Sequence, residues 1–378
     1  MTGRVRAAAL YAGGFLGPFA GAVPTAMFPE LGREFGVADH TASLSLTAYL
    51  IPFAALMLFS GTLGARWGAC RSVRVAYLVY VVASAACVFA GSFELFLVAR
   101  AVQGGANAFT TPLLLAAIGE VTPRARLGRA LGLFGALQAA GTTSAPLLGG
   151  LAAEVDWAWA FVVVGATAGV LAVVGLPSSL RGPSGESHRL RSVWRADVLR
   201  PAAVALVGWA CLGGMAFMVA LRAVDEFGLG AAQRGALLTG FGVFGLLSAH
   251  AVGRSIDRLG PRRAIALGAA AGAVPVVLVG VVPWIPMMAA VWALAGMTTQ
   301  FVQVGLNTLI LSDPGPNRAG ALSVVLAFRF FGGAAAPPAF TPIYQADPVA
   351  GFAIPAALLV LVVPVAMRRP HQAHRNTL

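Results

Sequence analysis

Arg100, Gln103 and Asn107 are the residues of this sequence whose types and spacing best suit the handling of protons. They stand at positions i, i+3 and i+7 of a long apolar stretch, so a helix would carry them on one face. Polar side chains are costly against lipid and favour a water-filled interior, with hydrogen bonding between helices as the alternative role. A fixed arginine charge lowers the pKa of a nearby carboxylate and can thereby release its proton. We therefore predict that these three residues take part in proton coupling.

A second polar stripe with the same spacing lies near residue 300, and an arginine follows in the next apolar stretch. Arg329 stands about 16 Å from Arg318 along a helix that rises about 1.5 Å per residue, which is mid-membrane depth. An arginine at that depth costs about 2.5–3.5 kcal/mol, and the sequence leaves a structural role and a substrate contact as alternatives. Large apolar side chains would complete a pocket, or pack against neighbours and lipid. The predicted substrate cavity consists of Gln300, Gln303, Asn307, Arg329, Trp209 and Met215.

Carboxylates are scarce near these positions. No Asp or Glu falls in the middle of a predicted helix, and the nearest candidates, Glu30, Asp225 and Glu226, stand at helix ends. We interpret these three as solvated loop carboxylates. His250 could titrate near neutral pH, although a lone histidine in an apolar stretch is more often a packing residue. The sequence therefore predicts proton coupling without identifying the carboxylate.

The composition is that of an integral membrane protein. Apolar residues make up 58% of the 378 residues, charged residues 11%, and the mean hydropathy is +0.81, whereas a soluble chain carries about 25% charge. All 26 basic residues are arginine, and the net charge of +12 indicates basic loops beside a membrane rather than nucleic-acid binding. The three cysteines suit neither a metal site nor a disulfide framework. We predict no enzyme activity, catalytic residue, metal or cofactor, because the sequence lacks a phosphate-binding loop and a nucleophile–histidine–acid set.

Twelve apolar stretches predict membrane-spanning helices of about 20 residues each. A basic stretch at 181–200, with Gly and Pro, is interpreted as a cytoplasmic linker between a six-helix bundle at 1–180 and another at 201–378. Most arginines fall on the linker side, which predicts cytoplasmic termini in the cell membrane. The predicted helices are 7–28, 42–64, 73–92, 94–118, 128–152, 159–179, 201–222, 232–253, 264–282, 285–310, 319–342 and 349–367.

A short basic loop with glycines occurs twice, once in each half. Corresponding residues are 192 positions apart, about half of the chain, which indicates two parallel repeats in tandem. The glycines allow a tight turn between two helices. The matching pairs are Gly61 with Gly253, Arg66 with Arg258, Gly68 with Gly260, Gly141 with Gly333, and Pro146 with Pro338.

These motifs resemble those of the major facilitator superfamily over essentially the whole chain. The loop that begins at Gly61 is similar to the signature Gly-x-Leu-x-Asp-Arg-x-Gly-Arg, with Ala65 in place of the aspartate that the second copy keeps as Asp257. The stretch around Arg100 resembles the helix 4 motif, and residues 132–150 resemble the helix 5 motif of drug/proton antiporters. The residues expected to act in gating are Gly61, Arg66, Gly68, Gly253, Asp257, Arg258, Gly260, Gly141, Pro146, Gly149 and Gly150.

The resemblance implies two six-helix repeats that alternate between inward-open and outward-open forms around a central cavity. It implies a secondary active transporter that exports hydrophobic or amphipathic small molecules, such as antibiotics, by proton antiport. Uptake or facilitated transport of a small polar metabolite is the alternative, and a non-transporting membrane sensor a remote one. A charged pair of Asp257 with arginines such as Arg129 is expected to stabilise the outward-open form. The expected partners are a small-molecule substrate, protons and the lipid bilayer, with no nucleic acid, and the chain is expected to be monomeric.

Overall fold

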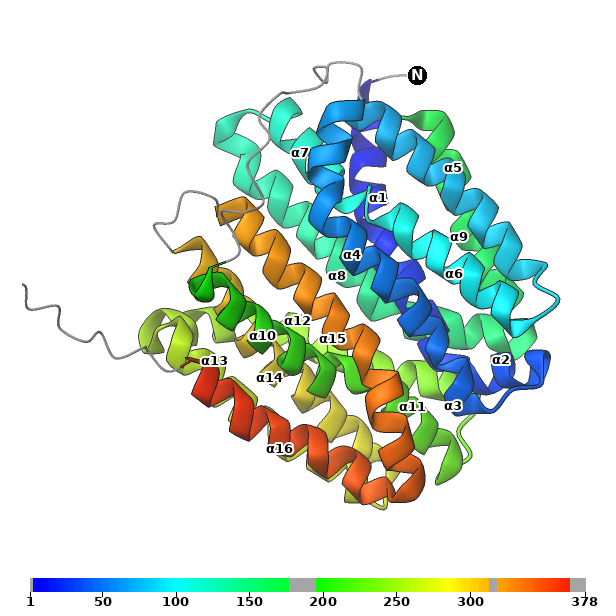
Figure 1. The fold of residues 1–378 in the computed structure, drawn as a ribbon, viewed down its shortest axis with the longest axis vertical. Coiled ribbons are helices and arrows are strands. Elements are labelled where there is room, and N and C mark those ends of the chain that lie inside the picture. Colours follow the sequence, from blue (N-terminus) through cyan, green and yellow to red (C-terminus); the bar gives the residue numbers. More distant parts are fainter. Residues whose placement is uncertain (1–2, 177–194, 313–317, 368–378) are drawn as a thin grey trace, which may run out of the picture.

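The computed structural model describes residues 3–176, 195–312 and 318–367, and every regular element within these ranges is a helix (Figure 1). The prediction of an all-α membrane protein is confirmed. Residues 181–194 of the predicted linker lie outside the described residues. The helices are α1 (Gly3–Ala22), η1 (Val23–Ala26), α2 (Phe28–Phe35), α3 (Asp39–Ala42), α4 (Leu44–Trp67), α5 (Ala69–Val88), α6 (Phe93–Asn107), α7 (Thr111–Val121), α8 (Arg124–Val155), α9 (Ala158–Val174), α10 (Ala196–Cys211), η3 (Gly213–Met215), α11 (Ala216–Asp225), α12 (Ala231–Leu259), α13 (Pro261–Val281), α14 (Ile285–Leu311), α15 (Arg318–Ala346) and α16 (Pro348–Met367).

The described ranges contain nine helical runs that are long and apolar enough to cross a membrane, and α9 is apolar but shorter. The two remaining predicted spans correspond to α8 and to α6 followed by α7. The break between α6 and α7 has a local cause. The Thr110 hydroxyl donates to the Asn107 carbonyl at 2.8 Å, and Pro112 at the start of α7 has no N–H for the helical ladder. Each predicted span thus overlaps a helix or a consecutive pair, while the count of twelve stays a prediction.

Matching close contacts in the two halves support the internal repeat. Gly104 of α6 lies against the Tyr49 carbonyl of α4, and Gly296 of α14 lies against the Phe241 carbonyl of α12. A Cβ atom on either glycine would stand 2.0 Å from that oxygen. The members of the two contacts differ by the same 192 positions as the basic loops. The halves therefore share the packing of corresponding helices as well as a loop sequence.

Both copies of the basic loop make the tight turn that the sequence predicts. Gly68 precedes α5 with a φ of 87°, and Gly260 precedes α13 with a φ of 79°. Only glycine adopts this left-handed region without strain, so the two positions let one helix end and the next begin within a single residue.

Leucine at Gly104 or Gly296 should destabilise the fold, because the backbone of the neighbouring helix occupies the place of its Cβ. Overpacking of this kind costs about 1–3 kcal/mol, and we expect a lower Tm for each purified variant in detergent. Gly61→Leu and Gly253→Leu are matched controls, since nothing lies within 4 Å of a Cβ at either position. Equal melting temperatures for all four variants would contradict these close contacts.

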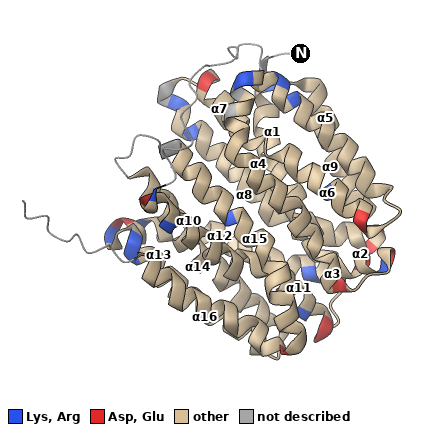
Figure 2. Ribbon diagram, viewed as in Figure 1, with Lys and Arg blue, Asp and Glu red and all other residues tan. Residues whose placement is uncertain are grey.

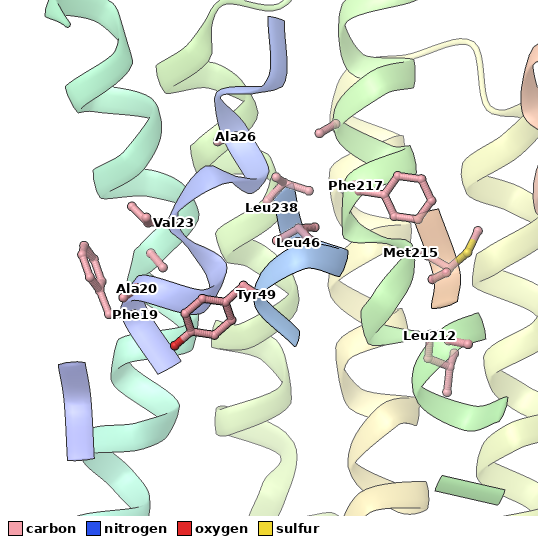
Figure 3. Close-up of a cluster of buried hydrophobic side chains, with 14 of the residues drawn as sticks. Phe19, Ala20, Val23, Ala26, Leu46, Tyr49, Leu212, Met215, Phe217 and Leu238 are labelled. Atoms are coloured by element: carbon pink, nitrogen blue, oxygen red, sulfur yellow. The ribbon is translucent and has the colours of Figure 1, made fainter. Parts of the chain in front are cut away.

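Two seams join helices from the first half of the sequence to helices from the second. Helix α8 packs along α12, and α4 packs along α15 (Figure 1). Buried side chains of α1, η1, α4, α11 and α12 form one apolar core, part of which is drawn in Figure 3. The seams therefore hold the halves together over surfaces that lipid does not reach.

The glycines of α8 do not all face α12. A Cβ on Gly150 would lie 2.2 Å from the Ala231 carbonyl of α12, so this glycine does let the two helices approach. Gly141 and Gly149 would instead meet carbonyls of α1 and η1, at 2.4 and 2.3 Å. Gly141 and Gly149 therefore set the approach of α8 to α1 and η1, and their predicted part in gating stays a prediction.

The charged residues separate into two ends of the helical bundle (Figure 2). Arginines gather at the ends near the amino terminus and near α13, whereas most acids lie at the opposite ends, near α2, α3 and α11. We call the end that carries Arg66, Arg71, Arg258 and Arg263 the arginine-rich face. The tan middle between the ends is almost free of charge, as expected of a membrane-embedded body.

Candidate functional site: a cavity beneath a sealed face

A small cavity lies in the second half of the chain, between α10, α14 and α15. Its volume is about 20 Å³, which is room for about one water molecule. Polar side chains from two of these helices, Gln303, Asn307 and Arg329, line it together with Trp209. Within the described residues, none of the three polar side chains has a hydrogen-bond partner in the protein. The cavity thus has a mostly apolar wall that includes three polar side chains whose donors and acceptors are unused.

Among the described residues that line this cavity, Arg329 is the only cation, and two aromatic rings lie beside it. Its guanidinium carbon lies 3.6 Å from the centre of the Trp209 ring and 5.4 Å from that of Phe330. Its Nε atom is buried without a partner. Neither α14 nor α15 contains an acidic residue. Cation–π contacts contribute about 2 kcal/mol or more when desolvated, so the rings, rather than a carboxylate, stabilise this charge.

Four of the six predicted cavity residues meet at this site, namely Trp209, Gln303, Asn307 and Arg329. Gln300 does not line it, because its amide lies beside Gly245 of α12. Met215 is fully buried in the core drawn in Figure 3 and does not line the cavity either. Helical spacing alone thus grouped Gln300 with residues that face a different neighbour.

The Arg100 stripe lies on one face of α6, as predicted, but this face is buried against other helices. Arg100 is 0% exposed and donates to the Ala20 carbonyl at 3.0 Å and to the Gly21 carbonyl at 3.3 Å, both in α1. The Ala20 carbonyl lacks its helical donor because residue i+4, Pro24, has no N–H. Arg100 therefore satisfies backbone groups that the end of α1 leaves unpaired.

The rest of the stripe extends this buried network. Arg100 also donates to the Gln103 side-chain oxygen, and Gln103 donates to Ser84 Oγ at 2.9 Å. Asn107 packs directly against α1, where a Cβ on Gly17 would collide with its amide. The water-filled interior expected around this stripe is absent from the described structure, which favours the alternative role of hydrogen bonding between helices. A part for Arg100 in proton coupling stays a prediction.

A buried ion pair joins the two halves at the acidic end. Arg234 of α12 donates through Nη2 to Glu30 Oε2 of α2 at 2.5 Å, and their side chains are only 3% and 13% exposed. Arg234 also donates to the Ala26 carbonyl at 3.0 Å and to the Leu229 carbonyl at 2.7 Å. The interpretation of Glu30 as a solvated loop carboxylate is therefore wrong. We call the end that carries this pair the sealed face.

Three further contacts close the sealed face across the seams. The backbone N–H of Ala232, in the first turn of α12, donates to Glu154 at 3.0 Å. Thr47 donates to the Ala334 carbonyl at 2.7 Å, and Nδ1 of the half-buried His40 lies 2.7 Å from Nε2 of the exposed Gln345. The seal thus combines one buried ion pair with hydrogen bonds at both seams.

The seams loosen toward the arginine-rich face. Gly128, Gly132 and Gly135 of α8 have open space where a Cβ would point, unlike Gly150 of the same helix. In the basic loops, Gly61 and Gly253 have similar open space, and Arg66 and Arg258 are exposed. The structure is therefore closed at the sealed face and open along the same helices at the other end.

Asp257 is exposed at the arginine-rich face, and no ion pair with Arg129 is present in the described part of the chain. Such a pair was expected in a form whose helix ends meet at this face. In this structure the helices are open at the arginine-rich face, so the pair and the gating roles of both basic loops stay predictions.

The Glu30–Arg234 pair is the main feature that sequence reasoning missed, although one signal was available. Arg234 falls inside the predicted helix 232–253, and an arginine within a span needs a carbonyl or a carboxylate as its partner. Arg222 gives the same signal, because it also falls inside a predicted helix, 201–222. In the structure it is 3% exposed and pairs with Glu226 at 2.6 Å.

Comparison with known proteins assigns this helical architecture to a family. The profile of the Major Facilitator Superfamily matches residues 10–337 and also 202–377. The chain belongs to the Major Facilitator Superfamily, and it is a membrane transporter of that class. Two halves built on one plan are the expected architecture of this superfamily.

The sequence relatives include proteins named as drug exporters. Drug efflux pump JefA of Mycobacterium tuberculosis (strain ATCC 25618 / H37Rv) is 32% identical over 156 residues, 40% of this chain and 31% of the relative. Puromycin resistance protein pur8 of Streptomyces alboniger is 32% identical over 157 residues, 41% of this chain and 31% of the relative. Each match spans less than a third of the relative's length.

Solved structures share the fold at low sequence identity. A POT family transporter in complex with 5-aminolevulinic acid has a TM-score of 0.80 at 9% identity, over 95% of this chain and 94% of that one. The human organic anion transporter MFSD10 (TETRAN) has a TM-score of 0.70 at 15% identity, over 97% of this chain and 100% of that one. These similarities concern the fold alone.

Proposed function

We propose that this protein exports amphipathic small molecules by alternating access, driven by the inward flow of protons. The observation that carries the proposal is a cavity with three polar side chains in its wall, together with a face that an ion pair between the halves seals. A transporter needs one closed face at a time, and the described seams are tight at one end only. The names of the drug-exporting relatives support the direction of transport.

In this proposal the two halves, 1–180 and 201–378, rock as units around the 181–200 linker. The arginine-rich face and both termini lie in the cytoplasm, as the positive-inside rule predicts for arginine-rich loops. The sealed face is then directed to the outside of the cell, and substrate enters the Arg329 cavity from the cytoplasmic side. In this proposal the chain acts as a monomer.

Glu30 is the carboxylate that we propose for proton coupling. It is largely buried, and it accepts from Arg234 of the other half and from Arg33 of its own helix, the latter at 3.0 Å. Asp39 and Asp225 belong to the same charge cluster. Protonation of Glu30 removes the negative partner of Arg234 and weakens the seal, which links proton uptake from outside to opening of that face.

The experiment that tests export uses everted membrane vesicles and a panel of amphipathic and polar compounds that includes puromycin. An imposed gradient with an acidic lumen should drive accumulation of at least one compound, and an uncoupler should release it. Vesicles without the protein are the control. Accumulation that ignores the gradient would favour the facilitator alternative, and the absence of transport for polar and amphipathic compounds alike would favour the sensor.

A further inference from the structure

We propose that the Arg329 cavity binds an anionic group of the substrate, so that the transported compounds are amphipathic organic acids. The inference rests on the proposed transport function and specifies its substrate class. Arg329 supplies the charge, Gln303 and Asn307 supply neutral donors, and Trp209 supplies a flat apolar wall. A carboxylate has two oxygens that suit the fork of a guanidinium.

The contrast between two arginines of the same membrane domain carries the argument. Arg100 is 0% exposed, and two carbonyls and one side-chain amide oxygen accept its hydrogen bonds. Arg329 is partly buried, and within the described residues its guanidinium has neither a hydrogen bond nor a carboxylate. The Nε atom is buried without a partner in both arginines, so the contrast lies in the acceptors that the protein gives to Arg100 and does not give to Arg329. A cation without an anion in a low-dielectric setting is unstable. The protein itself supplies three acceptors to Arg100, whereas it supplies none to Arg329, whose donors an anionic ligand would satisfy.

The neighbouring polar groups also remain available. The side chains of Gln303 and Asn307 line the same cavity, and neither has a hydrogen-bond partner in the described part of the protein. Amide N–H groups donate to carboxylate oxygens, and Arg329 adds its own donors. The cavity in its present state admits a group of about the size of one water molecule. The cavity therefore suits the carboxylate group of a ligand, and the remainder of the ligand must lie outside the cavity.

An apolar surface for that body adjoins the cavity at the α4–α15 seam. Phe330 follows Arg329 in the sequence, and its ring meets Phe53 of α4 edge-on, with centroids 4.7 Å apart. Met57, Ala108 and Ala327 complete a small apolar cluster that bridges the two halves. A compound with a carboxylate at Arg329 and an aromatic or alkyl body at this cluster would contact both halves at once.

The test compares phenylbutyrate with its neutral amide, phenylbutyramide, by isothermal titration calorimetry of the purified protein in detergent. The two probes differ in charge at nearly constant shape. We expect the acid to bind about tenfold more tightly than the amide, because only the acid pairs with the guanidinium. Arg329→Gln should bring the two affinities to within about twofold, and Arg329→Lys should keep part of the preference because it keeps the charge.

Thermal unfolding of the same variants separates a binding role from a structural one. Without ligand, Arg329→Gln should melt close to the wild-type temperature, because the lost contact with the Trp209 ring is offset by removal of a charge that has no carboxylate partner. Arg263→Gln, which changes an exposed arginine, is the control for loss of positive charge. A much lower Tm for Arg329→Gln with an unchanged acid preference would show a structural role and overturn the proposal.

Two other outcomes would also overturn it. Equal affinities of the acid and the amide for the wild type would remove the anion site. A titration with sodium chloride that gives the same signal, with phenylbutyrate no tighter than chloride, would assign the cavity to an inorganic ion. Binding in detergent requires no gradient and no direction. Gradient-driven export of neutral compounds alone would therefore refute the proposed substrate class and leave the proposed export function intact. Binding of the acid without any transport would refute the export function and leave the anion site intact.

Discussion

Arg100→Ala is expected to leave little folded protein in the membrane. The substitution removes a side chain that is 0% exposed and that pairs with the carbonyls of Ala20 and Gly21 and with Gln103. Each buried polar group left unpaired costs about 1–3 kcal/mol, and the lost volume beneath the Tyr49 ring adds a cavity term. The sum is comparable to the whole stability of an ordinary domain, about 5–15 kcal/mol.

The measurement is the yield of monodisperse protein after detergent extraction, followed by its Tm. Arg74→Ala, an exposed arginine of α5, should behave as wild type. Arg100→Lys should recover part of the yield, because it keeps a charge and donors but loses the planar fork. A fully stable Arg100→Ala would contradict the structural role, and full gradient-driven transport by the same variant would remove Arg100 from the coupling mechanism.

Glu30→Gln is expected to open the sealed face. Arg234 is only 3% exposed, and the substitution leaves its charge without the anion that now lies 2.5 Å away. Breaking a buried pair in this way costs about 3–5 kcal/mol. Because each 1.4 kcal/mol changes an equilibrium constant about tenfold, the ratio of closed to open forms should fall by about a hundredfold or more. The closed arrangement loses this stabilisation, whereas an arrangement that exposes Arg234 to water does not.

Spin labels at Val155 and Val349, exposed residues at the sealed ends of the two halves, report the opening as a distance distribution. The exposed Cys70 is first replaced by serine. Glu30→Gln should add a longer distance that the wild type shows only weakly. His40→Ala removes an exposed contact between the halves and should change little. Identical distributions for Glu30→Gln and the wild type would refute Glu30 as part of the seal.

Local features of the fold could be predicted from the sequence because their causes are local. Gly68 and Gly260 combine a helix end, a helix start and a repeated spacing, and each has the positive φ that a tight turn requires. The long apolar stretches predicted helices in the correct order, because lipid leaves the backbone no other partners. The start of α10 at Ala196 and the break after Asn107 shift the predicted boundaries, since single polar residues and prolines decide where such helices end.

The candidate site was less predictable, because its residues are defined by tertiary partners. Gln300 and Gln303 are three positions apart on one helix, yet only Gln303 lines the cavity. The difference depends on where α12 and α15 pack around α14. The spacing of residues within α14 cannot predict these neighbours. Glu30 and Arg234 pair across 204 positions, and only the seam between the halves brings them together.

Proton movement coupled to substrate is the most direct test of the account. The purified protein is reconstituted into liposomes that contain a pH-sensitive dye, and a compound selected with the vesicle panel is added on one side. Antiport predicts that substrate entering the lumen drives protons out, so that the lumen becomes more alkaline, and that Glu30→Gln abolishes this change. Substrate uptake at the full rate without any change in lumenal pH would contradict the account.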